Sequence, residues 1–180
     1  MKYSDIYRLY STSQPKDAIH QALREVPVDD SDEQYEDRSP LHLACQYGDA
    51  EGVKILLERD GEPNTKDANG STPIHILGRT SADRADEDKL KEIAVMLMEH
   101  GANIPRSAKN TTALIQCIRN RHFKMAEAII DSGARVNSTD LNGENVLFGL
   151  CAASGDIKRD IQFAKKELDE SVQYSYPENK

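Results

Sequence analysis

Apolar side chains recur along the chain in short clusters that are separated by turns. One cluster covers residues 41–45 and a second covers residues 53–57, with a glycine turn at residues 48–49 between them. Each cluster has the spacing of a helix with one buried face, and Pro40 suits the first turn of the first helix. Residues 67–70 then have the composition of a tight hairpin turn that ends in glycine. This part of the chain therefore predicts a unit of helix, turn, helix and hairpin.

The same unit recurs further along the chain. The string Ser39–His42 returns as Thr72–His75, 33 residues later, and weaker versions open at Thr112 and Asn145, which are again 33 residues apart. A fixed period of this length predicts a stack of similar units that share one continuous core. The predicted units cover residues 34–66, 67–106, 107–139 and 140–170, with boundaries that are good to a few residues.

Both ends of the stack differ from the repeated unit. Residues 1–28 contain two helical patterns, one capped by Ser4 and one that begins at Pro15. The apolar stripe of the second pattern consists of Ala18, Ile19, Ala22, Leu23 and Val26. We interpret this segment as an N-terminal helical cap, and the helix expected after Gly155 as a C-terminal cap, because end units present one polar side to water. Residues 171–180 have no periodicity and are expected to fray.

Two segments interrupt the regular pattern. Residues 28–39 form a connector with six carboxylates and one positive residue, Arg38. This connector is either a solvated, mobile linker or an acidic lip for a basic partner. Thr80 to Asp88 is an insertion of about eight residues between the two helices of the second unit. It is either a functional loop or a tolerated surface loop.

The 33-residue period, together with openings of the type Thr-Pro-Leu-His, resembles the ankyrin-repeat family. The resemblance implies an all-α solenoid of about four repeats, including degenerate ends, with helical caps at both termini. In that family the histidine of the motif hydrogen-bonds to the backbone of a neighbouring turn, so we assign this role to His42 and His75. A shared metal ion is not expected, because stacked units would separate the two histidines by roughly 10 Å.

The resemblance also implies where a partner would bind. In the family, variable contact positions lie in the hairpins and just after the small-residue pair of the first helix. Carried over by position, the candidate partner-binding residues are Tyr35, Glu36, Arg38, Gln46, Tyr47, Asn69, Ser71, Arg79, Thr80, Lys109, Arg119, Asn120 and Asn142. Tyrosine and arginine dominate interface hot spots, and we expect Tyr47 and Arg79 to be close neighbours on adjacent repeats. The alternative is that these are ordinary surface residues.

Composition narrows the range of partners. The 180 residues carry a formal charge of −8, which argues against binding to nucleic acid or to anionic membranes and favours a basic protein or peptide. No apolar run is long enough to cross a bilayer and the first residues lack a signal peptide, so we expect an intracellular, cytoplasmic protein. We also expect a monomer. Cys45, Cys117 and Cys151 are then expected to be reduced packing thiols.

The sequence carries no motif for catalysis or cofactor binding. Phosphate-binding glycine loops, zinc-ligand spacings and nucleophile motifs are absent, and residues 86–88 are carboxylates that we expect in a loop with nothing to desolvate them. We therefore predict no enzyme activity, no metal and no cofactor. The predicted function is a non-catalytic module that binds a protein or peptide through the concave face formed by hairpins and first helices. The alternative is an acidic inhibitor, of the immunity-protein type, that occludes a basic site of an enzyme such as a nuclease.

Overall fold

The computed structural model describes residues 1–81, 83–103, 112–136, 139, 140, 143, 145, 146 and 150. Within these residues the chain forms eight α-helices and one short 3-10 helix, which confirms the predicted all-α class. The helices are α1 (Tyr3–Ser11), α2 (Lys16–Glu25), η1 (Glu33–Tyr35), α3 (Pro40–Gln46), α4 (Ala50–Leu57), α5 (Pro73–Leu77), α6 (Glu87–Glu99), α7 (Ala113–Arg119) and α8 (Phe123–Asp131).

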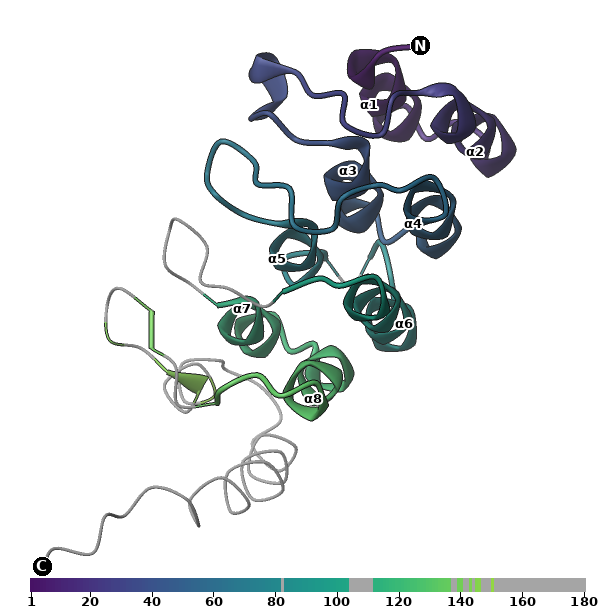
Figure 1. The fold of residues 1–180 in the computed structure, drawn as a ribbon. Coiled ribbons are helices and arrows are strands. Elements are labelled where there is room, and N and C mark those ends of the chain that lie inside the picture. Colours follow the sequence, from purple (N-terminus) through teal and green to yellow (C-terminus); the bar gives the residue numbers. More distant parts are fainter. Residues whose placement is uncertain are drawn as a thin grey trace, which may run out of the picture.

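The helices are stacked in two rows (Figure 1). One row contains α1, α3, α5 and α7, and the other contains α2, α4, α6 and α8. Each pair packs against the next pair, and the hairpins between pairs project from the first row to one side (Figure 1). We call the surface formed by these hairpins and the first-row helices the concave face. The prediction of a helix, turn, helix and hairpin unit is therefore confirmed.

A continuous apolar core lies between the two rows. All eight positions predicted to be buried in the first unit are buried, and the same pattern continues into the neighbouring pairs. The eight are Leu41, Leu43, Ala44, Cys45, Val53, Ile55, Leu56 and Leu57. No pair of such short helices could bury its apolar face alone, so the stacking of pairs supplies the core.

The motif histidine connects one unit to the next turn of the chain. His42 is fully buried, and its Nδ1 accepts hydrogen bonds from the Ser39 backbone N–H at 3.2 Å and from the Ser39 hydroxyl at 2.9 Å. Its Nε2 must then carry the proton, and it donates to the Ser71 carbonyl oxygen at 3.0 Å. Burial lowers the pKa of His42 to about 4, so the ring is neutral near pH 7. The predicted hydrogen bond to a neighbouring turn is confirmed at His42.

The second motif histidine repeats the local part of this arrangement. His75 is buried, and its Nδ1 lies 2.8 Å from the Thr72 hydroxyl and 3.4 Å from the Thr72 backbone nitrogen. Thr72 therefore caps α5 as Ser39 caps α3.

The N-terminal pair differs from its prediction in three details. Ser4 lies inside α1 rather than capping it, because the helix already begins at Tyr3, whose N–H donates to the Asp30 carboxylate at 2.6 Å. Pro15 is the residue before α2 rather than its first residue. Ala18 is exposed, since it lies at the edge of the apolar stripe of α2.

The acidic connector contains the short helix η1 and turns, and its residues from 28 to 38 are exposed or half-buried. The Asp32 carboxylate accepts the Gln34 N–H at 2.9 Å and starts η1. The Ala68 N–H of the next hairpin donates to the Glu36 carbonyl oxygen at 2.8 Å. These bonds use local carboxylates and neighbouring backbone groups, which explains how a strongly charged segment becomes ordered.

The carboxylates at residues 86–88 are also misplaced by the prediction, because they begin a helix instead of lying in a loop. Asp86 caps α6 by accepting the Lys89 N–H at 2.9 Å, and Glu87 and Asp88 occupy its first turn. Negative side chains are favoured there by the partial positive charge of a helix N-terminus. Asp88 also pairs with Lys124 of α8 at 2.6 Å, so this helix start is tied to the third unit.

Candidate functional site

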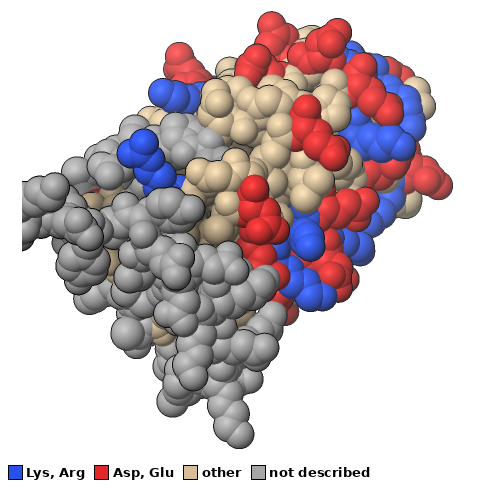
Figure 2. Space-filling model, turned by 60° about the horizontal axis from the view of Figure 1, so that its bottom comes forward, with Lys and Arg blue, Asp and Glu red and all other residues tan. Residues whose placement is uncertain are grey.

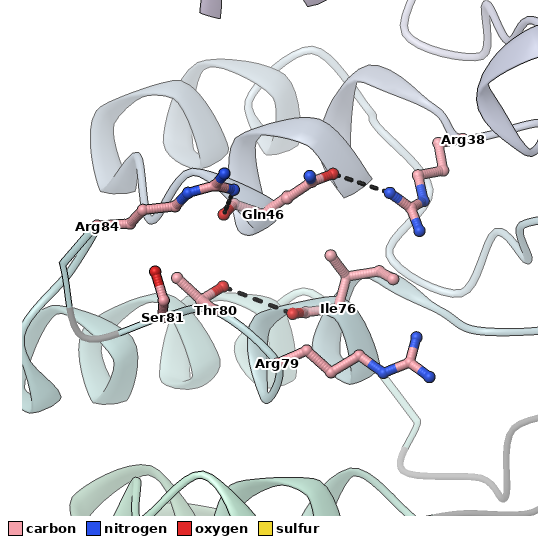
Figure 3. Close-up of a pocket in the computed structure, with 7 residues that line it drawn as sticks. All are labelled: Arg38, Gln46, Ile76, Arg79, Thr80, Ser81 and Arg84. Carbon is pink, nitrogen blue, oxygen red and sulfur yellow. Dashed lines mark hydrogen bonds between the residues drawn. The ribbon is translucent and has the colours of Figure 1, made fainter. Parts of the chain in front are cut away.

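A pocket of about 290 Å³ opens between α3 and α5, beside the insertion (Figure 3). Its lining comes from the end of the connector, the last turns of both helices and the insertion. The lining residues are Arg38, Gln46, Ile76, Arg79, Thr80, Ser81 and Arg84. Four of these, namely Arg38, Gln46, Arg79 and Thr80, were among the predicted contact residues. The structure thus brings together segments that are far apart in the chain.

The insertion folds back over the first unit. The guanidinium of Arg84 lies over the Tyr47 ring, 4.4 Å from its centroid, and its Nη1 donates to the Gln46 carbonyl oxygen at 3.1 Å. Tyr47 also contacts Tyr10, whose ring is stacked on it with centroids 4.7 Å apart. A cation over an aromatic ring is attracted by the negative face of the ring. Arg84 takes the place beside Tyr47 that we expected for Arg79.

Two contacts hold the insertion in this position. Gly48 has φ +61°, and a Cβ added there would lie 2.4 Å from the Cβ of Ala85, which is itself buried. The hydroxyl of Thr80 donates to the Cys45 carbonyl oxygen at 3.0 Å. Thr80 is buried, so this predicted contact residue serves mainly the fold and exposes little of its surface in the pocket.

Arg38 is already paired with groups of its own chain. Its Nη1 donates to the Gln46 side-chain oxygen at 2.9 Å, and its Nη2 pairs with the exposed Glu36 carboxylate. Its Nε lies 3.6 Å from Asp67 Oδ2, and neither of these two buried atoms has a hydrogen bond among the described residues. Asp67 Oδ1 meanwhile accepts the N–H groups of Asn69 and Ser71 and so closes the hairpin turn. The charge of Arg38 is therefore offset by two carboxylates.

Arg79 and Arg84 differ from Arg38 in that they have no carboxylate partner among the described residues. Both side chains are exposed, and no carboxylate of the described residues lies within ion-pair distance of either. The Arg79 guanidinium points toward the end of the pocket where Arg38 lies, and the Arg84 guanidinium lies at the other end (Figure 3). Among the described residues, the pocket therefore has at each end an arginine without a carboxylate partner.

The remaining predicted contact residues are spread over the hairpins and the third unit. Tyr35 is half-buried and packs against the rings of Tyr3 and Tyr7, with centroids 5.6 and 4.3 Å away. Asn69 is half-buried, and Ser71 is buried within its own turn. Ser71 is thus closed to a partner, whereas Tyr35 and Asn69 are partly accessible.

In the third unit, Arg119 and Asn120 are both exposed at the end of α7. Arg119 pairs with Asp140 at 3.0 Å, and the Asn120 amide donates to the Gly78 carbonyl oxygen at 2.9 Å. Lys109 and Asn142 lie outside the described residues.

A second polar cluster, which was not predicted from the sequence, joins the N-terminal pair to the first unit. The Asp49 carboxylate is buried, accepts the Tyr10 hydroxyl hydrogen bond at 2.7 Å, and lies 3.0 Å from His20 Nε2. The sequence identified Asp49 only as a turn residue, because its partners lie 29 and 39 residues away. Tyr10 and His20 both contact Asp49 and none of the three lines the pocket, so the cluster belongs to the interface between the N-terminal pair and the first unit.

The surface shows how the net negative charge is distributed. Figure 2 shows one face, where carboxylates and cationic side chains are interspersed rather than divided into two large patches.

Among the described residues, no group of three or more metal-ligating side chains could hold an ion. Every helix in the described ranges is too short or too polar to cross a membrane.

Comparison with known proteins gives matches over a large part of the chain. Residues 22–77 match the family described as "Ankyrin repeats (many copies)". The chain is 29% identical over 124 residues, or 68% of its length, to the ankyrin repeat protein nuc-2 of Neurospora crassa. It is 33% identical over 115 residues to Rabankyrin-5 of Mus musculus and 37% identical over 62 residues to a transient receptor potential channel A1 homologue of Caenorhabditis elegans.

The matches cover 61% of the chain for Rabankyrin-5 and 34% for the channel homologue. They cover only 10%, 9% and 5% of nuc-2, Rabankyrin-5 and the channel homologue respectively. The likeness therefore concerns the repeat segment that these proteins share with the chain.

Proposed function

The chain belongs to the ankyrin-repeat family, and from this premise we propose that it is a non-catalytic module that binds a protein or peptide partner through its concave face. Ankyrin repeats generally mediate interactions between proteins. The stacked rows leave an extended face whose hairpins and first helices are open on one side (Figure 1). An intracellular location and a monomeric state remain predictions.

The observation that carries the proposal is the pocket beside Tyr47. It gathers Arg38, Arg79 and Arg84 next to a tyrosine, and these are the residue types that dominate binding energy at interfaces. Several of these side chains are already held: Arg38 by Gln46 and Arg84 by the Tyr47 ring. Groups that are ordered before binding lose less conformational entropy when a partner arrives, which favours affinity.

The alternative of an acidic inhibitor receives less support. Such an inhibitor would use the carboxylates of the connector to approach a basic site, but several of these carboxylates already form hydrogen bonds or ion pairs within the chain. Asp30 accepts the Tyr3 N–H, Asp32 starts η1, and Glu36 pairs with Arg38. The pocket next to them presents arginines instead of carboxylates.

A matched pair of substitutions tests the concave face. Ala68 is exposed at a hairpin tip on this face, and Ala18 is exposed on α2 in the second row. Three purified proteins would be immobilised: the wild type, Ala68→Trp and Ala18→Trp. Each would be used to capture proteins from a cell lysate, and the captured proteins would be identified by mass spectrometry. We expect the same protein to be captured by the wild type and Ala18→Trp and to be lost with Ala68→Trp, because an indole on the hairpin blocks the approach.

Circular dichroism and a melting curve check that both variants are folded. Equal capture by the two variants would contradict the assignment of the concave face, and capture lost only with Ala18→Trp would place the partner on the second row.

A further inference from the structure

The pocket between α3 and α5 has a charge opposite to that of the chain as a whole. The protein has a formal charge of −8, yet the pocket is lined by three arginines and by no carboxylate. Glu36 and Asp67, which lie nearby, both pair with Arg38. Arg79 and Arg84 remain without a carboxylate partner among the described residues. The local sign of the site is therefore positive.

Arg84 is held in place by contacts that use only part of its hydrogen-bond donors. One of its N–H groups donates to the Gln46 carbonyl oxygen, and the plane of the group lies over the Tyr47 ring. A guanidinium has five N–H donors in a fixed fork, so most of its donors stay available. A fixed fork of this kind matches the paired oxygens of a carboxylate or phosphate.

The pocket also has room and supporting groups for a small acidic side chain. Its volume is about 290 Å³, and Ser81, which is exposed, turns its hydroxyl toward the space between α3 and α5 (Figure 3). Ile76 adds an apolar part of the lining that methylene groups can contact. With cationic groups at both ends, an entering oxyanion reduces the repulsion between like charges.

We propose that this pocket binds an oxyanion group, a carboxylate or a phosphate, on an acidic segment of the partner, with Arg79 and Arg84 as the binding cations. The inference rests on the proposed function and names the chemistry of the partner segment. It replaces the expectation of a basic partner, which came from the net charge, by an acidic one at this site. Net charge acts over long range and is screened by salt, whereas binding in the pocket depends on the nearest charges.

The test uses the full chain and three short peptides. The ¹⁵N-labelled protein is titrated at low salt with a capped tetraglutamate peptide, with a capped peptide that contains one phosphoserine, and with a neutral glutamine peptide. The signals followed are the arginine Nε–H groups and the backbone amides of Ser81 and Arg84. We expect saturable shifts at these groups with at least one anionic peptide and none with the glutamine peptide. Comparison of the tetraglutamate titration with the phosphoserine titration also shows whether the pocket prefers a carboxylate or a phosphate.

The double variant Arg79→Gln, Arg84→Gln removes both charges and keeps side chains of similar reach. We expect it to weaken binding of the anionic peptide by about tenfold or more, since each arginine would make charge-assisted hydrogen bonds to the anion. The control Lys54→Gln, Lys91→Gln removes the same charge from exposed positions on α4 and α6 and should keep the affinity. A retained nuclear Overhauser contact between the Ala85 methyl group and the Gly48 amide shows that the insertion has kept its place in the double variant.

Backbone amide shifts at positions 81 and 84 that are equal in the wild type and the double variant, or no shifts with either anionic peptide, would overturn the inference. Neither result would touch the proposed function, because that proposal is tested with Ala68→Trp at a hairpin tip and not with the arginines.

Discussion

Gly48 and Ala85 touch so closely that no side chain fits at position 48: a Cβ there would lie 2.4 Å from the Cβ of Ala85. Gly48 belongs to the turn of the first unit and Ala85 to the insertion of the second. The insertion can therefore lie flat on the preceding unit only because residue 48 is glycine. This contact explains why Arg84, the residue before Ala85, reaches the Tyr47 ring.

Gly48→Ala should displace the insertion and destabilise the protein. The new methyl group would overlap Ala85, and alanine also resists the φ of +61° at this position. We expect a loss of about 1–3 kcal/mol in the free energy of unfolding, measured by urea denaturation, and weaker contact of Arg84 with Tyr47. Gly101→Ala is the control, since it has φ +87° but no atom within 4 Å of the added Cβ. An equal loss in both variants would mean that the backbone angle alone matters.

Tyr10→Phe should weaken the interface between the N-terminal pair and the first unit. The lost hydroxyl donates to the buried Asp49 carboxylate at 2.7 Å, and hydrogen bonds to charged groups contribute about 1.5–3 kcal/mol. The ring remains, so stacking on Tyr47 is kept. Tyr7→Phe is the matched control, because its hydroxyl makes no hydrogen bond with the described residues, and it should change stability by less than about 0.5 kcal/mol. Similar losses in both would contradict a special role for the Tyr10 hydroxyl.

Stability should fall as the solution is acidified from pH 6.5 toward pH 4. Burial lowers the pKa of His42 to about 4 from an ordinary value of 6.5, so in this window the unfolded chain binds a proton that the folded chain does not. The contribution is complete above pH 6.5 and is lost at up to about 1.4 kcal/mol per pH unit as the pH falls. Burial also lowers the pKa of His122, which adds a change of the same sign.

The pH effect can be assigned to His42 by substitution. Urea midpoints would be measured at several pH values for wild type, His42→Gln and His100→Gln, the last being an exposed imidazole at the end of α6. We expect His42→Gln to be less stable near pH 7 but to lose less stability on acidification than the other two proteins. A slope that is identical in all three would show that His42 does not titrate in this window.

Cys45 and Cys117 should resist thiol reagents in the folded protein. Both are free and fully buried, and burial raises the pKa of each thiol, so little reactive thiolate forms. With Cys151→Ser as background, Ellman's reagent should label neither cysteine within minutes in buffer and both in denaturant. Fast labelling without denaturant would mean that the core opens readily.

The repeat period predicted the two-row fold well, because burial follows directly from the apolar pattern of each unit. The buried positions from Leu41 to Leu57 needed only local spacing and the alignment of one unit on the next, whereas the hydrogen bond of His42 to a neighbouring turn was implied by the resemblance to the ankyrin-repeat family. The folded connector could not be predicted in this way. Its order depends on pairs such as Asp30 with the Tyr3 N–H, 27 residues apart, and no periodicity indicates such pairs.

For the site, sequence position identified the right neighbourhood but not the exposure of each side chain. Thr80 and Ser71 fall at contact positions of the family, yet both are buried because their polar groups bond to Cys45 and Asp67. Arg84 was missed because it lies in the insertion, which has no counterpart in the other units. Its position depends on the fit of Ala85 against Gly48, a steric relation between two units.

The side chains of Tyr10, Tyr47 and Arg84 come from three successive helix pairs and lie one upon the next. In a linear array each unit ordinarily touches only its immediate neighbours, so ends unravel separately from the middle. These three side chains form contacts across two successive boundaries between units, and Tyr47 takes part in both contacts. We therefore expect the unfolding of the N-terminal pair and that of the second unit to be linked, with Tyr47 as the residue that both contact.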